Sequence, residues 1–127
     1  MAVTALDFIV STNEDWRDTM EIKEGDPLAF VDLTGSTFEA HLRAPIESLI
    51  PDLVLNTTNG KLFFDPDQAD TDLVGRLSFN VPKEEMQYIH PATYEIDILW
   101  TNPDGLVKRI VAGKVYAQRG VTRAVNL

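Results

Sequence analysis

Residues 94–116 read Tyr94-Glu-Ile-Asp-Ile-Leu-Trp-Thr-Asn-Pro-Asp-Gly-Leu-Val-Lys-Arg-Ile-Val-Ala-Gly-Lys-Val-Tyr116. Two runs rich in β-branched and aromatic residues flank the turn sequence Asn102-Pro103-Asp104-Gly105. Proline supplies the φ angle of the second turn position, and aspartate and glycine suit the positions that follow it. The stretch therefore predicts a long antiparallel β-hairpin.

The rest of the chain repeats the same alternation of apolar and polar residues, interrupted by glycine, proline, asparagine and aspartate. An Asn-Gly pair in Thr57-Thr-Asn-Gly60 predicts a second hairpin, between two of these segments. Such short, evenly spaced strands are typical of a sandwich. We expect an all-β, Ig-like antiparallel β-sandwich that forms a single domain over residues 1–127. The further strands are expected at residues 6–10, 16–22, 28–33, 37–43, 53–56, 61–64 and 73–81.

A short crossover helix is expected near residues 83–89. Pro82 precedes two glutamates, and Pro91 ends the segment, which is the usual arrangement at helix ends. Tyr94 follows this crossover and resembles the tyrosine corner of Ig-like sandwiches, in which the phenol hydroxyl binds upstream backbone. We therefore expect Tyr94 to have a structural role.

Composition narrows the class of protein. The chain has 127 residues, 44% of them hydrophobic, and no cysteine, so disulfides, zinc-thiolate sites and thiol nucleophiles are excluded. We expect no membrane segment, because no apolar run approaches the length of a membrane span. We also expect no signal peptide, because Met1 is followed by no basic leader and Asp7 interrupts the apolar stretch. A net charge of −9 argues against nucleic acid as a partner.

Charge is divided unevenly along the chain. All 20 acidic residues and 6 of the 11 basic ones lie in residues 1–104, whereas residues 105–127 hold the other 5 basic residues and no acid. The end of the chain is thus a basic element on an acidic domain. Its candidate interface residues are Arg119, Arg123, Lys108 and Lys114.

Two interpretations of these four residues stand side by side. If Thr101 lies opposite Leu106, Lys108 is diagonal to Asp97 and Lys114 is diagonal to Glu95, and the opposite charges simply stabilise the hairpin. We favour this interpretation for the two lysines. Arg119 and Arg123 lie beyond the hairpin, where they either remain solvated or meet the acidic surface of a neighbouring subunit.

No residue pattern indicates catalysis or a cofactor. The acidic run Asp65-Pro-Asp-Gln-Ala-Asp-Thr-Asp72 lacks the glycine and glutamate of an EF-hand, so we interpret it as a polar loop, with a weak cation or glycan site left open. His41 and His90 have no nucleophile placed near them by sequence. We expect Trp16 and Trp100 to pack in the core, since both fall on inward faces. The expected protein is not an enzyme, and we predict no catalytic residue, cofactor or metal.

A resemblance to a known family covers nearly the whole chain. The motifs that carry it are, in order, Gly25-Asp26-Pro27, Val31-Asp-Leu-Thr-Gly35, Phe38-Glu-Ala-His-Leu-Arg43, Pro91-Ala-Thr-Tyr-Glu-Ile-Asp97, the Pro-Asp-Gly turn, Gly113-Lys-Val-Tyr116 and Gly120-Val-Thr-Arg123. Together they resemble the small Ig-like domains of tailed-bacteriophage and prophage tail or baseplate proteins, including the N-terminal domain of baseplate upper proteins.

The resemblance implies a non-enzymatic virion structural component, associated with a tail or baseplate and assembled in the bacterial cytoplasm. Its implied partners are other phage structural proteins and further copies of itself, with neither nucleic acid nor membrane among them. The alternative is a carbohydrate-binding or adhesin-like module, which requires Trp16, Tyr88 or Tyr116 at the surface.

Overall fold

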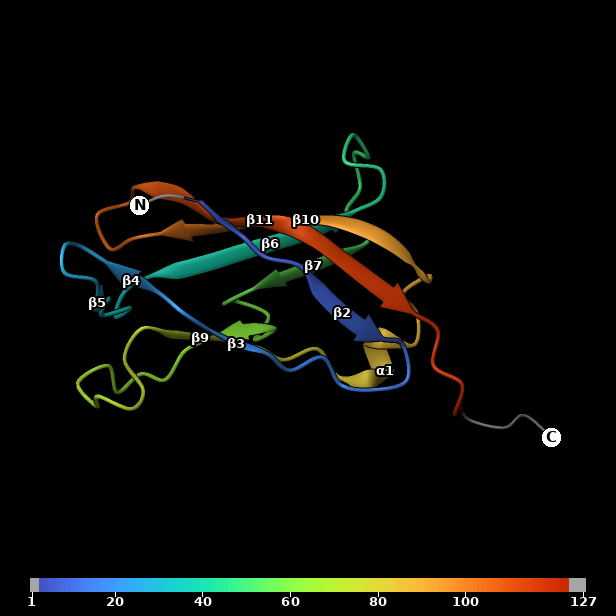
Figure 1. Ribbon diagram of the computed structural model, residues 1–127, viewed down its shortest axis with the longest axis horizontal. Helices are drawn as coiled ribbons and strands as arrows, with labels where there is room; N and C mark the ends of the chain where they lie inside the picture. The colour runs from blue at the N-terminus through green and yellow to red at the C-terminus, as the bar shows by residue number, and fades with distance from the viewer. Residues whose placement is uncertain (1–2, 124–127) are drawn as a thin grey trace.

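A computed structural model describes residues 3–123 and shows an all-β sandwich of the Ig-like class (Figure 1). The large sheet has the order β1-β11-β10-β6-β7, with β2 also paired to β11, and the small sheet has the order β3-β9-β8. A two-stranded ribbon, β4-β5, lies beside them. The strands are β1 (Thr4–Ala5), β2 (Phe8–Ser11), β3 (Thr19–Glu21), β4 (Lys23–Glu24), β5 (Ala29–Phe30), β6 (Thr37–Arg43), β7 (Leu53–Asn56), β8 (Leu62–Phe63), β9 (Arg76–Phe79), β10 (Ala92–Thr101) and β11 (Val107–Gln118).

The predicted hairpin is the centre of the large sheet. β10 pairs with β11 on one side and with β6 on the other, both antiparallel. Its inward residues Tyr94, Ile96, Ile98 and Trp100 are all buried. The turn is closed by the Gly105 N–H, which donates to the Asn102 carbonyl at 2.9 Å.

The predicted register of the hairpin is wrong. Thr101 pairs with Val107 rather than Leu106, because the Asn102 side chain accepts the N–H groups of Asp104 and Leu106 and so widens the loop. A β-bulge then shifts the register again between Ile98 and Leu99. Such a bulge puts an extra residue on one strand and changes every later partner. Lys114 consequently lies directly opposite Glu95, not diagonal to it.

The second predicted hairpin, at residues 57–60, is also wrong. β7 pairs with β6 in the large sheet, whereas β8 pairs with β9 in the small sheet, so this turn carries the chain between the sheets. The Asn59 side chain closes the turn by accepting the N–H groups of Asn56 and Lys61 and donating to the Val54 carbonyl, and the Asn56 side chain accepts the Asn59 N–H in return. A local side-chain network thus replaces the strand ladder expected from the Asn-Gly pair.

Several expected strands are shorter in the structure. The strand expected at 6–10 is β2, shifted to Phe8–Ser11, and β1 (Thr4–Ala5) precedes it as a separate strand; both run parallel to β11. Of residues 16–22 only β3 is a strand, and Trp16 forms an isolated bridge with Val81. Residues 28–33, 61–64 and 73–81 shorten to β5, β8 and β9, while β6 and β7 have the predicted bounds. The crossover helix is α1 (Lys83–Met86).

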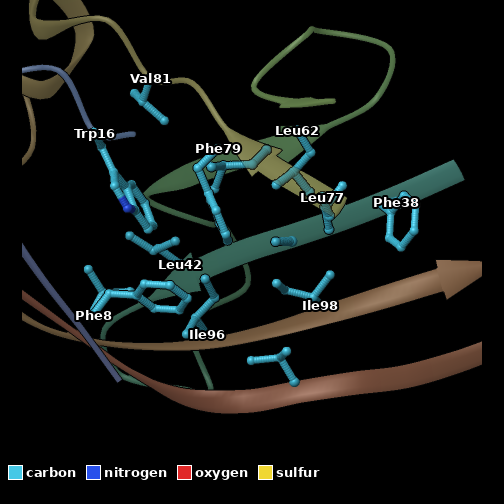
Figure 2. Close-up of a cluster of buried hydrophobic side chains, with 14 of the residues drawn as sticks. Phe8, Trp16, Phe38, Leu42, Leu62, Leu77, Phe79, Val81, Ile96 and Ile98 are labelled. Atoms are coloured by element: carbon cyan, nitrogen blue, oxygen red, sulfur yellow. The ribbon is translucent and has the colours of Figure 1, made fainter. Parts of the chain in front are cut away.

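Aromatic contacts join the two sheets (Figure 2). Trp16 stacks on Phe79 with ring centroids 4.9 Å apart, and Phe8 from the large sheet lies 5.2 Å from Phe79. Both tryptophans are buried, as expected, and the Trp100 indole N–H donates to the Ser36 hydroxyl at 2.9 Å. Burial of such rings contributes both apolar area and ring–ring contact to the stability of the sandwich.

Tyr94 is the predicted tyrosine corner. Its hydroxyl donates to the His90 carbonyl, across the turn that follows α1. Burial, followed by the charge of Asp52, raises the pKa of the Tyr94 phenol, which extends the pH range over which the hydroxyl is a donor to more alkaline values. The corner ties the crossover to the central strand of the large sheet.

Replacement of Tyr94 by phenylalanine should lower the free energy of unfolding by about 1 kcal/mol, because one intramolecular hydrogen bond is lost and the His90 carbonyl loses its partner. Urea denaturation measures the difference. Tyr116→Phe is the matched control, since Tyr116 lies on the exposed outer face of β11, and it should leave stability unchanged. Equal effects of the two changes would contradict a structural role for the corner.

Candidate functional site

The structure divides the four candidate basic residues into two pairs. Lys108 lies 3.4 Å from a Glu24 carboxylate oxygen and 5.4 Å from the centre of the Trp100 ring. The Lys114 ammonium lies 2.6 Å from a Glu95 oxygen, and this hydrogen bond and charge raise the pKa of Lys114. Both lysines are therefore paired within the chain, although the partner of Lys108 is Glu24 and not the predicted Asp97.

The two arginines lie beyond β11 and are exposed. The Arg123 guanidinium donates to the Gly120 carbonyl at 3.1 Å. Within residues 3–123, no carboxylate lies within ion-pair distance of Arg119 or Arg123. Residues 124–127 of the basic element lie outside the described residues.

Specific contacts hold the start of this basic segment. The Gly120 N–H donates to the Thr12 hydroxyl at 3.0 Å, and the Asn13 side-chain amide donates to the Thr122 carbonyl at 3.0 Å. A side chain at position 120 would collide with Asn13, because an added Cβ would lie 2.0 Å from Asn13 Cγ. We call residues 119–123 the C-terminal arm. Sequence reasoning missed Asn13, whose only signal is its place in a polar turn after β2.

A groove opens along one side of the sandwich. One cleft of about 540 Å³ lies between Thr4 of β1, Ile110 of β11 and residues 20–25. A second cleft, of about 250 Å³, lies between residues 6–9 and residues 18–20. Met20 lines both clefts, so the two adjoin at its side chain. We call this feature the lateral groove; it separates the free edge of β1 and β2 from the free edge of β3.

The charged side chains that line the lateral groove are mainly acidic. Asp7, Asp18, Glu21 and Glu24 line its two clefts, and Lys23 is the single basic residue among the lining residues. Glu21 and Lys23 lie 3.3 Å apart and neutralise each other in part. The rim is thus a net negative surface beside uncovered strand edges.

The acidic loop at 65–72 is organised by one buried residue. Gln68 is 5% exposed, and its side-chain oxygen accepts the N–H groups of Leu33 and Gly75, both at 3.0 Å. The side-chain amide of Gln68 donates to the Asp65 carbonyl at 2.6 Å. The Asp65 and Asp70 carboxylates accept backbone N–H groups two residues further on, as in Asx turns. Among residues 3–123, no group of three acidic or histidine side chains is placed to hold a metal ion.

Of the three aromatic residues named for the alternative carbohydrate-binding role, two lie at the surface. Trp16 is only 3% exposed, so its ring is not available to stack on a sugar. Tyr88 is 84% exposed and Tyr116 is 37% exposed. They lie on different elements, Tyr88 after α1 and Tyr116 on β11. No described helix is long and apolar enough to cross a membrane.

Comparisons with known proteins place the chain in no family. No family model and no curated protein matches the sequence. A chain of a crystal structure of ICOS in complex with ICOS-L and an anti ICOS-L VNAR domain aligns with 12% identity and a TM-score of 0.44, covering 91% of this chain and 56% of that chain. Drosophila OTK, extracellular domains 3–5, aligns with 10% identity and a TM-score of 0.35, covering 87% of this chain and 32% of that chain. At these scores the likeness carries no argument; the Ig-like fold rests on the two-sheet architecture and the tyrosine corner described above.

Replacement of Gln68 by leucine should lower the free energy of unfolding by about 2–4 kcal/mol, because two buried N–H groups lose their acceptor. Chemical denaturation measures this loss. Gln118→Leu is the control, since Gln118 is exposed at the end of β11 and should tolerate the change. A Gln68→Leu protein as stable as the unaltered one would show that the Leu33 and Gly75 amides find other partners.

Proposed function

We propose that this protein is a non-enzymatic structural component of a bacteriophage or prophage particle, associated with the tail or baseplate. It acts through contacts with other structural proteins and with copies of itself, and it assembles in the bacterial cytoplasm. The family resemblance of its turn and strand motifs suggests the particle, and the charges of the described surface suggest how the contacts form.

One observation carries the proposal. Lys108 and Lys114 are neutralised by Glu24 and Glu95, whereas Arg119 and Arg123 stand exposed on an anchored arm. A basic arm on an acidic domain is complementary to another copy of the same domain. Such complementarity steers association and selects the partner.

Displaced pKa values in the domain have structural causes, which supports a non-enzymatic role. Hydrogen bonds from the Thr34 hydroxyl and N–H lower the pKa of Asp32, in a turn. The raised pKa values of Tyr94 and Lys114 come from the tyrosine corner and from an ion pair. Catalytic sites displace the pKa values of convergent groups in a cleft, and these three groups belong to three separate structural contacts.

The experiment that tests the assignment is detection of the protein in purified particles. Prophage induction of the source strain, density-gradient purification and mass spectrometry should find the protein in the particle fraction, at a fixed ratio to the tail proteins. Its presence only in the soluble fraction of induced cells would contradict the proposal.

The charge-reversed double variant Arg119→Glu/Arg123→Glu should weaken self-association by about tenfold or more, because attraction to the acidic domain becomes repulsion. Light scattering over a range of protein concentrations, at low and high salt, measures the effect. Arg109→Glu is the matched control, because Arg109 is an exposed arginine on the body of β11. Association that is insensitive to both salt and the double change would contradict an electrostatic interface.

A further inference from the structure

We propose that the C-terminal segment of one copy, residues 119–127, docks as an added β-strand along the free edge of β3, in the lateral groove of a second copy. This inference rests on the proposed self-association and specifies its two surfaces. The donor is the segment that begins with the C-terminal arm, and the acceptor is a strand edge with an apolar floor.

The edge of β3 presents unpaired backbone groups. The Phe79 N–H donates to the Asp18 carbonyl, and the Ile22 N–H donates to the Gly75 carbonyl. In residues 18–22 it is therefore the backbone N–H and C=O groups of the even-numbered residues that point toward the small sheet. Antiparallel pairing alternates along a strand, which turns the N–H and C=O groups of Thr19 and Glu21 toward the open side. Such an edge is a template for another strand.

The facing edge of the groove is free as well. The Leu6 N–H donates to the Ala112 carbonyl, and the Thr12 N–H donates to the Gln118 carbonyl. The backbone N–H and C=O groups of the even-numbered residues in and around β2 therefore point toward β11. The backbone of Ile9 consequently faces away from β11, and its side chain is 72% exposed. The groove therefore lies between two strand edges, neither of which is paired on its outer side within the described residues.

The floor of the groove suits the apolar side of a strand. Met20 is half-buried where the two clefts meet, with Phe8 and Phe79 beneath one cleft and Ile110 beneath the other. Methionine adapts its shape to an incoming side chain. Leu28, which is 70% exposed, adds a further apolar contact at the far end.

The C-terminal segment has the pattern of a strand. It reads Arg119-Gly-Val-Thr-Arg-Ala-Val-Asn-Leu127, in which Val121, Arg123, Val125 and Leu127 alternate with smaller or polar residues. Val121 is 92% exposed, although it is β-branched and apolar. Residues 121–127 span about 23 Å when extended, which matches the roughly 20 Å of residues 19–24 along the groove.

Charge favours this occupant. Arg123 falls on the apolar side of the segment, so its stem can lie on the groove floor while its guanidinium reaches the acidic rim. Glu21 and Glu24 at this rim each contact a lysine of their own copy, and an incoming guanidinium would share these carboxylates with the lysines. Four acidic residues and one lysine line the groove. A basic, β-prone segment is the complement of that surface.

Docking occurs between copies because the arm is held away from its own groove. Thr12 and Asn13 bind Gly120 and Thr122 at the far end of β2. In Figure 1 the red chain after β11 leaves the domain on the right, whereas β4 lies on the left. Donor and acceptor are different surfaces, so the contact is heterologous and generates a ring or a filament.

A Thr19→Pro variant tests the acceptor. Proline removes the N–H that faces the groove. It leaves the hydrogen bonds between β3 and β9 intact, because the Thr19 N–H is not one of their donors. Thr19→Val is the matched control, since it also loses the hydroxyl contact with Ser78, 3.1 Å away, but keeps the N–H. We expect Thr19→Pro to weaken self-association by about tenfold or more and Thr19→Val to leave it nearly unchanged. Thermal melts verify that both variants fold.

A deletion of residues 121–127 tests the donor, and mixing tests the pair. Each variant alone should be monomeric by analytical ultracentrifugation. The Thr19→Pro chain keeps its segment and the truncated chain keeps its groove, so an equimolar mixture should form a 1:1 dimer that grows no further.

The outcomes separate this inference from the proposed function. If the full chain assembles but neither variant changes its association, the inference is wrong and self-association stands on another surface. If both variants are monomeric but their mixture forms no dimer, the segment and the groove do not meet, and the inference is again wrong. A full chain that stays monomeric at every concentration overturns both the inference and the self-associating form of the proposed function.

Discussion

The contact among Phe8, Trp16 and Phe79 holds the two sheets together. Among residues 3–123, no strand pairing joins the large sheet to the small one, so the sandwich depends on side chains packed between them. Trp16 and Phe79 belong to the small-sheet side and Phe8 to the large sheet, and all three rings are buried. Packed rings contribute apolar burial and specific ring geometry, which fixes how the sheets face each other.

That packing also explains why one side of the sandwich stays open. The aromatic cluster lies close behind β2 and β3, so these two strands approach from opposite sheets and meet through side chains only. Each keeps an outer edge without a ladder partner among the described residues. Proteins usually protect such edges with charges, and here the rim carries Asp7, Asp18 and Glu21. The same carboxylates that discourage random strand addition are the ones that a basic segment would recognise.

Local signals in the sequence predicted those parts of the structure that depend on neighbouring residues. The Asn-Pro-Asp-Gly turn, the alternation of β6 and the inward tryptophans followed from turn chemistry and period-two patterns. The tyrosine corner followed from the position of Tyr94 after a short helix. Register did not follow, because the Asn102 side chain and a bulge at β11 each moved it by one residue. The Asn-Gly turn was misassigned, because strand partners are chosen by the whole sheet and not by the turn.

The interaction site shows the same division. The sequence by itself determined the all-β class, the inward aromatic positions and the concentration of basic residues after position 104. Only the tertiary structure decided that Lys108 and Lys114 are paired within the chain, that Gln68 organises the acidic loop, and that Asn13 anchors the arm. These contacts join residues up to 109 positions apart. Their partners depend on how strands are ordered and on which edges remain free, and these properties arise only when the sheets pack.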